Sequence, residues 1–206
     1  MGTCNTTTVA LAGWLLLSGG IVPRTYQILP TLSQATYAVD EVFFNENNRL
    51  FTAVGRTGQV SGTIHLDPAR PDQSRVEEVV VDLRDLSTDS QRRDRAVRDG
   101  YLHTARFPHA RLTDGRLSET PIPITSGQSF HYRLVGNLTL HGVTLETSWQ
   151  GEATLAADTL RGVARTRIKM SSFGIEVPRL LTLRSEDDVQ LEIRYVAIAS
   201  NGVRPL

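Results

Sequence analysis

The residues best suited to acid–base or metal chemistry in this chain are five histidines: His65, His103, His109, His131 and His141. A transition-metal site within a short segment favours histidines separated by one or three residues, and none of the five has such a neighbour. His65 and His131 fall on the polar sides of predicted strands, and His141 falls in a predicted turn. The spacing therefore indicates structural or solvent-exposed roles and predicts no metal site.

Signatures of a catalytic nucleophile or a phosphate-binding loop are also missing. The sequence has no Gly-x-Ser-x-Gly, and Cys4, its single cysteine, precedes the first apolar run. The glycine-rich segment 55–58 lacks the lysine of a phosphate-binding loop. The acidic pairs 77–78 and 187–188 stand at strand starts, where water solvates them. We therefore expect no enzymatic activity and no cofactor.

The segment GNLTLHGVTLETSWQG, residues 136–151, explains one of the histidines. A two-residue turn at His141-Gly142 aligns residues 140 with 143, 138 with 145, 136 with 147 and 134 with 149. Apolar side chains then meet in three of these four pairs, and Gly136 leaves room near the fourth. Tight hairpin turns need a positive φ at their central residues, which glycine adopts freely and histidine more often than most. The segment is therefore predicted to be a β-hairpin.

A period of two, with apolar and polar residues alternating, continues through most of the chain from Tyr37 onward. Such alternation is typical of antiparallel sheets with one side on a core and one in water. Many strands at close spacing favour a sandwich or a barrel. The clearest examples are residues 59–66, 77–84, 131–140, 143–150 and 189–197.

One segment, STDSQRRDRAVRDG at residues 87–100, has the pattern of a helix. Thr88 and Gln91 have the spacing of a capping box, and Gly100 suits the end of a helix. Only Ala96 and Val97 are apolar between Thr88 and Gly100. We expect a short polar helix on the surface, or a flap over one end of a barrel.

The amino end is expected to lie outside the barrel domain. Residues 9–17 form an apolar run that is too short for a membrane span and has the length of a signal-peptide core, although no Lys or Arg precedes it. We assign residues 1–22 to a signal peptide or an amino-terminal anchor, 23–35 to a linker, and 36–200 to the folded domain. The expected location is the periplasm or the extracellular space, with tethering by the apolar segment left open.

The charge balance excludes one class of partner. Lysine plus arginine number 22 and aspartate plus glutamate number 22. A chain without net charge has no long-range attraction to phosphate groups, so nucleic acid is not expected as a partner.

Several motifs occur in the order found in the YceI-like proteins, and about residues 37–199 resemble that family. The segments 136–146 and 171–178 resemble its G-x-L-T-x-H-G-V-T hairpin and its F-G-I segment. Four further motifs also match. A G-x-I-x-x-D strand matches at Gly62, Ile64 and Asp67, and a V-D-x-x-S-x-D-T strand end matches at Asp82, Leu86, Ser87 and Asp89. An R-D-x-x-x-R helix matches at Arg93, Asp94 and Arg98, and an F-L-x-T-x-x-F-P-x-A segment matches at Leu102, Thr104, Phe107, Pro108 and Ala110.

The resemblance implies both a fold and a function. It implies an all-β, elongated, lipocalin-like antiparallel barrel of about eight strands, with one short polar helix inserted. It also implies a carrier that holds a polyisoprenoid chain, of polyprenyl or quinone type, in a tunnel through the barrel, with no catalytic residues. Many members have a histidine soon after the helical Arg-Asp, where this chain has Ala96 and Val97, so no histidine contact to a lipid head group carries over.

The inward-facing apolar residues are the expected ligand contacts, and small residues at Gly136, Gly162 and Ala164 can leave a channel between them. Sequence alone does not separate such a tunnel from a filled core. The residues expected to line the barrel are Val60, Ile64, Val79, Val81, Leu83, Tyr132, Leu134, Leu138, Leu140, Val143, Leu145, Trp149, Leu191 and Ile193.

Asp94 and Arg95 are the candidates for contact with a polar head group, because they form a charged pair on a helix near a barrel end. The alternative is a surface ion pair of little energetic value. The expected partner is an isoprenoid lipid, with a peripheral membrane encounter and a homodimer left open. The alternative function is a non-enzymatic stress-response or interaction module whose barrel is only a scaffold.

Overall fold

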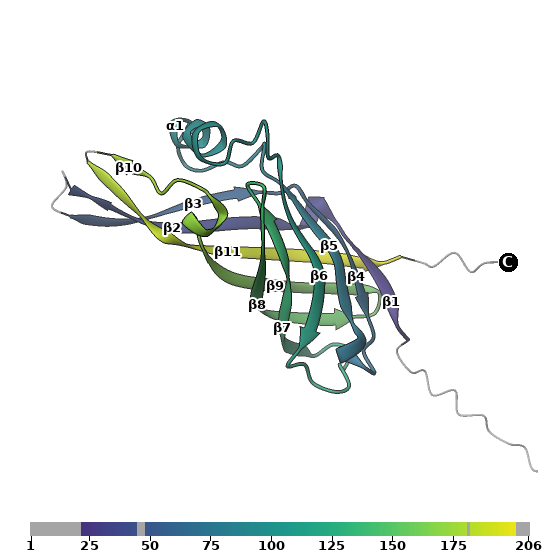
Figure 1. Cartoon of the computed structure of the whole chain (residues 1–206). Helices are drawn as coiled ribbons and strands as arrows, with labels where there is room; N and C mark the ends of the chain where they lie inside the picture. The colour runs from purple at the N-terminus through teal and green to yellow at the C-terminus, as the bar shows by residue number, and fades with distance from the viewer. Residues whose placement is uncertain (1–21, 45–47, 181, 201–206) are drawn as a thin grey trace, which may run out of the picture.

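An antiparallel barrel of eight strands forms the body of the protein (Figure 1). The computed structural model describes residues 22–44, 48–180 and 182–200. Around the barrel the strands follow the order β1-β4-β5-β6-β7-β8-β9-β11, and β11 pairs with β1 to close it. The expected all-β antiparallel barrel of about eight strands is confirmed. The bounds are Arg24–Ile28 (β1), Val60–Leu66 (β4), Arg75–Asp82 (β5), His109–Ser118 (β6), Ser129–Leu140 (β7), Val143–Ala156 (β8), Thr159–Lys169 (β9) and Leu183–Ala199 (β11).

Strand β11 extends well beyond the barrel and supports a second, flatter part of the sheet. It has 17 residues and pairs along one edge with β9. Its other edge pairs with β1 near Ala199 and with β2 (Gln34–Phe43) from Leu183 to Arg194. Strand β3 (Arg49–Thr57) pairs with β2, and the short β10 (Arg179–Leu180) pairs with β11. These strands form the extension on the left of Figure 1.

The linker predicted for residues 23–35 was wrong for most of its length. Residues 24–28 are strand β1, which pairs with both β4 and β11, and residue 34 begins β2. Tyr26 and Ile28 are 1% and 5% exposed, so this short strand belongs to the core. Its five residues are too few to reveal a period, and the prolines at 23 and 30 suggested a loop. Of the residues assigned to a signal peptide or anchor, all but Val22 lie outside the described residues.

The hairpin predicted at His141-Gly142 is confirmed with its register. Residues 140, 138, 136 and 134 of β7 pair with 143, 145, 147 and 149 of β8. The two turn residues have φ angles of 52° and 80°, both in the left-handed region. Because a shift of one residue would turn the whole apolar row outward, this register decides which side chains face the barrel interior.

One half of the barrel is filled by aromatic rings packed onto glycines. A Cβ at Gly151 would lie 2.1 Å from the ring of Tyr132, and one at Gly162 would lie 2.6 Å from the hydroxyl of Tyr195. The two tyrosine hydroxyls are 3.1 Å apart and hydrogen-bonded. The expectation that Gly162 leaves a channel is therefore wrong, because the ring of Tyr195 occupies the space that the missing side chain leaves.

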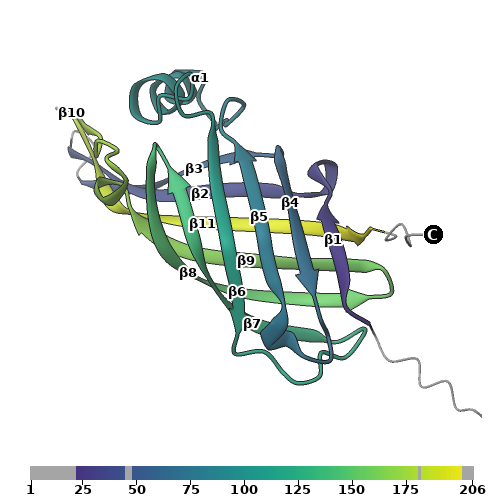
Figure 2. The same ribbon diagram turned by 45° about the vertical axis from the view of Figure 1, so that its right-hand side comes forward.

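The predicted polar helix is present and lies over the opposite end of the barrel (Figure 2). Helix α1 (Gln91–Arg95) continues as a π-helical segment, η4 (Ala96–Tyr101), in which the N–H of Leu102 donates to the carbonyl of Val97. The predicted capping box is wrong. Ser90, not Thr88, caps the helix, and its hydroxyl accepts from the N–H of Arg93.

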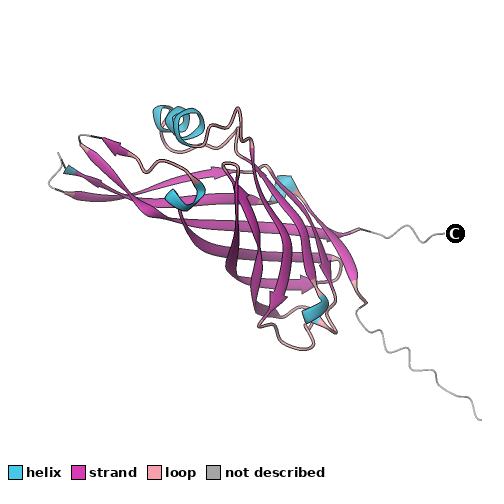
Figure 3. Cartoon of the chain, in the orientation of Figure 1, coloured by secondary structure: helices cyan, strands magenta, loops and turns pink. Residues whose placement is uncertain are grey.

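Single turns of 3-10 helix connect some of the strands. Figure 3 shows how small the helical share of the molecule is beside its strands. Among the described residues, no helix combines the length and the apolar character needed to cross a membrane. The turns are Pro30–Leu32 (η1), Pro71–Gln73 (η3) and Ser171–Phe173 (η5).

Glycine at position 62 is expected to be required for the pairing of β4 with β5. A Cβ there would lie 2.4 Å from the backbone carbonyl oxygen of Glu78, which cannot move without breaking the sheet. We expect Gly62→Ala to lower the free energy of unfolding by about 2 kcal/mol. Gly58→Ala is the matched control, since the nearest atom to its Cβ is 3.8 Å away. Urea unfolding of both variants tests this, and equal stabilities would contradict it.

Candidate functional site

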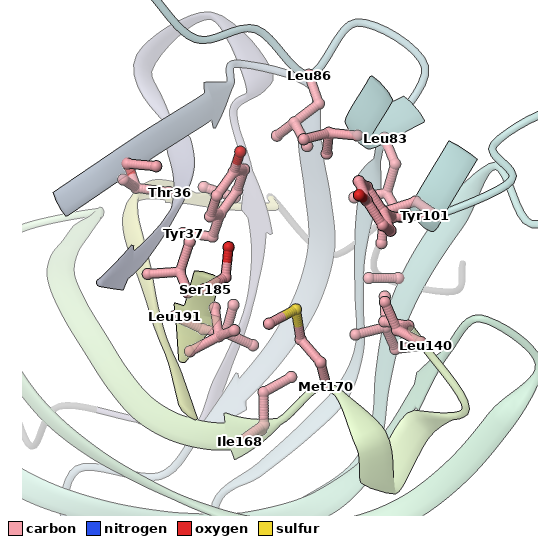
Figure 4. A pocket seen from close by; sticks show the side chains of 18 of the residues that line it. Thr36, Tyr37, Leu83, Leu86, Tyr101, Leu140, Ile168, Met170, Ser185 and Leu191 are labelled. Carbon is pink, nitrogen blue, oxygen red and sulfur yellow. The ribbon is translucent and has the colours of Figure 1, made fainter. Parts of the chain in front are cut away.

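The half of the barrel next to the helix contains an open cavity of about 520 Å³. This volume lies within the range of small-molecule sites, roughly 300–1,000 Å³. Strands β2, β3, β5 and β11 supply much of the wall, and the helical segment 92–102 covers one side. The lining is mostly aliphatic, as Figure 4 shows for Leu140, Ile168, Met170 and Leu191.

Eight of the fourteen residues predicted to line the barrel do line this cavity. They come from β5 and the residue after it, from the β7–β8 hairpin and from β11, and the barrel brings these segments together. They are Val79, Val81, Leu83, Leu138, Leu140, Trp149, Leu191 and Ile193.

Three more of the proposed residues lie deeper, around a second cavity of about 40 Å³. Ile64, Tyr132 and Leu134 line it, and Trp149 contributes to the walls of both cavities. The interior therefore has an open half and a nearly filled half, which meet where Val79, Leu112, Trp149 and Ile193 line both cavities.

The remaining three proposed residues line neither cavity. Val60 is fully buried by its neighbours in the core. Val143 and Leu145 stand on the part of β8 that has no ladder to β9, since those two strands pair only from Gln150 onward. The barrel wall is incomplete beside them, and Leu145 is 37% exposed.

Strand β2 supplies alternate residues to the cavity, a contribution that was not predicted from the sequence. Ala35, Tyr37, Val39, Glu41 and Phe43 all line it. The period-two signal was present from Tyr37 onward, but a glutamate at an inward position interrupts the apolar row. Alternation by itself gave no reason to assign Glu41 to the interior.

Glu41 is the most unusual residue of the cavity wall. It is 6% exposed, and its Oε1 accepts a hydrogen bond of 3.4 Å from the hydroxyl of Ser185 on β11. Its Oε2 lies 3.8 Å from a guanidinium nitrogen of Arg93 and has no hydrogen-bond partner. Burial raises the pKa of the Glu41 carboxyl, while the charge of Arg93 acts in the opposite direction.

Two tyrosines add hydroxyl groups to the same cavity. The ring of Tyr37 lies over Gly55, where a Cβ would be 2.2 Å from a ring carbon. Tyr101, at the end of the helical segment, lines the cavity from the other side in Figure 4. Burial raises the pKa of Tyr37 to about 12 and also raises that of Tyr101. Both hydroxyls therefore stay protonated at neutral pH and can donate a hydrogen bond.

Asp94 and Arg95, the predicted head-group contacts, do not line the cavity. The carboxylate of Asp94 accepts hydrogen bonds of 2.6 and 2.7 Å from the backbone N–H and the hydroxyl of Thr88, which lower its pKa. Arg95 is exposed. Helical phase explains their position, because residues 92, 93, 96 and 97 share the side that faces the cavity.

His141 also contacts residues outside its own turn. Its Nε2 lies 2.9 Å from Nδ1 of His103, and its Nδ1 lies 3.3 Å from the carbonyl oxygen of Phe173. It therefore joins the loop after the helix and the 171–173 turn to the β7–β8 hairpin. The separation of 38 residues between the two histidines hid this pair from any short-spacing rule. Among the described residues, no group of three or more potential ligands is arranged to hold a metal ion.

Comparison with known proteins gives a family match that covers most of the chain. The profile of the YceI-like domain matches residues 26–197. No curated protein matches the chain.

Solved structures share the fold at low sequence identity. A polyisoprenoid-binding domain from Saccharophagus degradans, implicated in plant cell wall breakdown, is 18% identical, with a TM-score of 0.60 over 85% of this chain and 98% of that one. BcnA from Burkholderia cenocepacia is 17% identical, with a TM-score of 0.62 over 82% and 98%. A YCEI protein from Campylobacter jejuni is 19% identical, with a TM-score of 0.54 over 71% and 84%. At these identities the similarity establishes the common fold.

The burial of Glu41 is expected to make stability depend on pH. Because its folded-state pKa is raised, its contribution to stability is complete below its unfolded-state pKa and is lost as the pH rises through the folded-state value. Glu41→Gln keeps the shape and removes the charge. We expect this variant to melt at a higher temperature than wild type at about pH 8, with the difference shrinking toward about pH 4.

Thermal melts of the two proteins across this pH range test the prediction. Glu186→Gln is the matched control, because Glu186 is exposed on the same strand as Ser185. If Glu41→Gln lowered the melting temperature by the same amount at about pH 4 and at about pH 8, the prediction would be wrong.

Proposed function

The chain belongs to the YceI-like domain family, and from this premise we propose that its barrel binds and carries the hydrocarbon chain of a polyisoprenoid lipid, of polyprenyl or quinone type. The observation that supports this most directly is the open, mostly aliphatic cavity of about 520 Å³. One solved relative is described as a polyisoprenoid-binding domain. A binding role without catalysis agrees with the family and with the aliphatic lining.

The energetics favour a long apolar ligand over a small polar one. A Kd of about 1 µM corresponds to about −8 kcal/mol, and association costs about 4 kcal/mol or more in lost freedom of motion. At about 0.8 kcal/mol for each buried CH₂, about 15 carbon atoms supply this energy. That is the carbon content of about three isoprene units, so a carrier needs to enclose only part of a longer chain.

The division of the interior near Trp149 sets where such a chain would end. Trp149 contributes to both cavities, and the Tyr132–Tyr195 pair fills the barrel beyond it. A chain that enters from the helix end therefore stops at Trp149 unless these rings move. The alternative of a barrel that serves only as a scaffold requires a filled interior, and the cavity favours the carrier.

Filling the cavity is expected to displace the lipid. The side chain of Leu191 projects into the cavity in Figure 4. We expect Leu191→Trp to reduce the lipid recovered with the purified protein severalfold, because the larger ring occupies ligand volume. Organic extraction followed by mass spectrometry measures this. Leu145→Trp, at a position that lines neither cavity, should leave the yield unchanged, and repeated absence of lipid from wild type would contradict the proposal.

We also propose that the protein is exported, to the periplasm or beyond the cell. The support is the apolar run at residues 9–17, with the length of a signal-peptide core. We expect the full-length gene product to be recovered outside the cytoplasm. Amino-terminal analysis of the protein from each cell fraction tests this, and a cytoplasmic product with intact Met1 would contradict it. A peripheral membrane encounter and a homodimer stay predictions.

A further inference from the structure

The cavity wall contains one buried acceptor that the protein leaves without a hydrogen bond. Oε2 of Glu41 has no partner, although the residue is 6% exposed and lines the cavity. A buried carboxylate oxygen without a hydrogen bond is costly, and native structures satisfy most such groups. In a binding cavity the missing partner can come from the ligand.

The neighbours of this oxygen limit what that partner can be. The hydroxyl of Ser185 already donates to Oε1 of Glu41. The guanidinium of Arg93 is 3.8 Å from Oε2, which is beyond hydrogen-bond range but close enough for one oxygen atom to contact both. A hydroxyl group has the chemistry that this pair lacks, because it can donate its proton to Oε2 and accept from the N–H of Arg93.

Other contacts hold Arg93 in position, so the separation of 3.8 Å between its guanidinium and Oε2 of Glu41 is fixed by the fold. Its guanidinium also pairs with the carboxylate of Asp89 and lies over the ring of Phe51, 5.4 Å from the ring centre. Its side chain is 23% exposed, which is low for an arginine on a polar helix. Two carboxylates therefore already share its positive charge.

This charge arrangement disfavours an anionic head group in direct contact with Oε2 of Glu41, although Arg92 also lines the cavity. A phosphate or diphosphate at this point would add negative charge beside the buried carboxylate of Glu41, and Arg93 is already paired with Glu41 and Asp89. Like charges close together in a poorly solvated site repel strongly. Tyr37 and Tyr101 offer neutral hydroxyls in the same cavity, which suit a neutral head group equally well.

We propose that Glu41, Ser185 and Arg93 form a subsite that selects isoprenoid lipids with a free, uncharged hydroxyl head. The inference rests on the proposed function and names the class of head group that the carrier accepts. Two sources present this chemistry, a polyprenol and the reduced form of a prenylated quinone. Phosphorylated polyprenyl lipids and fully oxidised quinones lack the neutral donor that Oε2 requires.

The test compares ligands that differ only in the head group. Delipidated full-length protein is titrated with geranylgeraniol, its methyl ether and its monophosphate, and binding is followed by the change in tryptophan fluorescence, since Trp149 lines the cavity. The ether keeps the acceptor and loses the donor. We expect the alcohol to bind roughly tenfold or more tightly than either analogue, the value of one hydrogen bond to a charged group.

A second arm distinguishes the two sources of the hydroxyl. A menaquinone of the same prenyl length is compared with its quinol under anaerobic conditions, and the proposal expects the quinol to bind more tightly. Whichever of the alcohol and the quinol has the lower Kd identifies the preferred source.

Variants assign the selectivity to the subsite. In Glu41→Leu, which removes a buried charge without removing volume, the affinity ratio of alcohol to ether should fall to about one. Ser185→Ala should lower it in part, and Glu186→Gln, at an exposed position, should leave it unchanged. An unchanged affinity ratio of alcohol to ether in Glu41→Leu would overturn the inference. Equal binding of the alcohol and the ether by the wild-type protein would also overturn it, and that measurement needs no variant. If no isoprenoid binds at all, the proposed function itself fails.

Discussion

The structure depends on one constraint, that each edge of a β-strand can pair with one other strand at a time. One edge of β11 follows β9, and the other is shared between β1 and β2. Between them, Leu29 donates its N–H to the carbonyl of Val196, and the N–H of Val196 donates to the hydroxyl of Ser33. These two hydrogen bonds continue the pairing along this edge of β11 at the point where its partner changes from β1 to β2. Beyond this point β2 and β3 leave the barrel, and the wall opens around the cavity.

The two halves of the barrel use inward-facing positions in different ways. In the closed half, Tyr132 and Tyr195 lie on glycines of neighbouring strands and satisfy each other's hydroxyl groups. In the open half, aliphatic residues and the buried carboxylate of Glu41 surround the cavity. The same alternation of side chains therefore builds a rigid floor at one end and a binding cavity at the other. The buried carboxylate lowers stability at neutral pH, a cost that a functional site can retain.

The sequence predicted those features that depend on local pairing and periodicity. The β7–β8 hairpin was predicted with its register, because a two-residue turn and two apolar rows leave one alignment that buries both. Strand β1 was missed, because five residues between prolines carry little periodic signal. The helix was predicted, but its cap and the side that faces the cavity were not. Asp94 bonds to Thr88 across a loop, and no spacing rule for helices anticipates that contact.

By itself, the sequence determined the fold class, the strand register at the hairpin and the resemblance to one family, because these follow from alternation, turn chemistry and motifs along the chain. Only the tertiary structure decided where the interior is empty. Whether an inward glycine leaves a void depends on which ring from another strand reaches it, as Tyr195 reaches Gly162. The contact of Glu41 with Ser185, 144 residues away, was likewise decided by the pairing of β2 with β11, since the separation in sequence contains no information about which strands become neighbours.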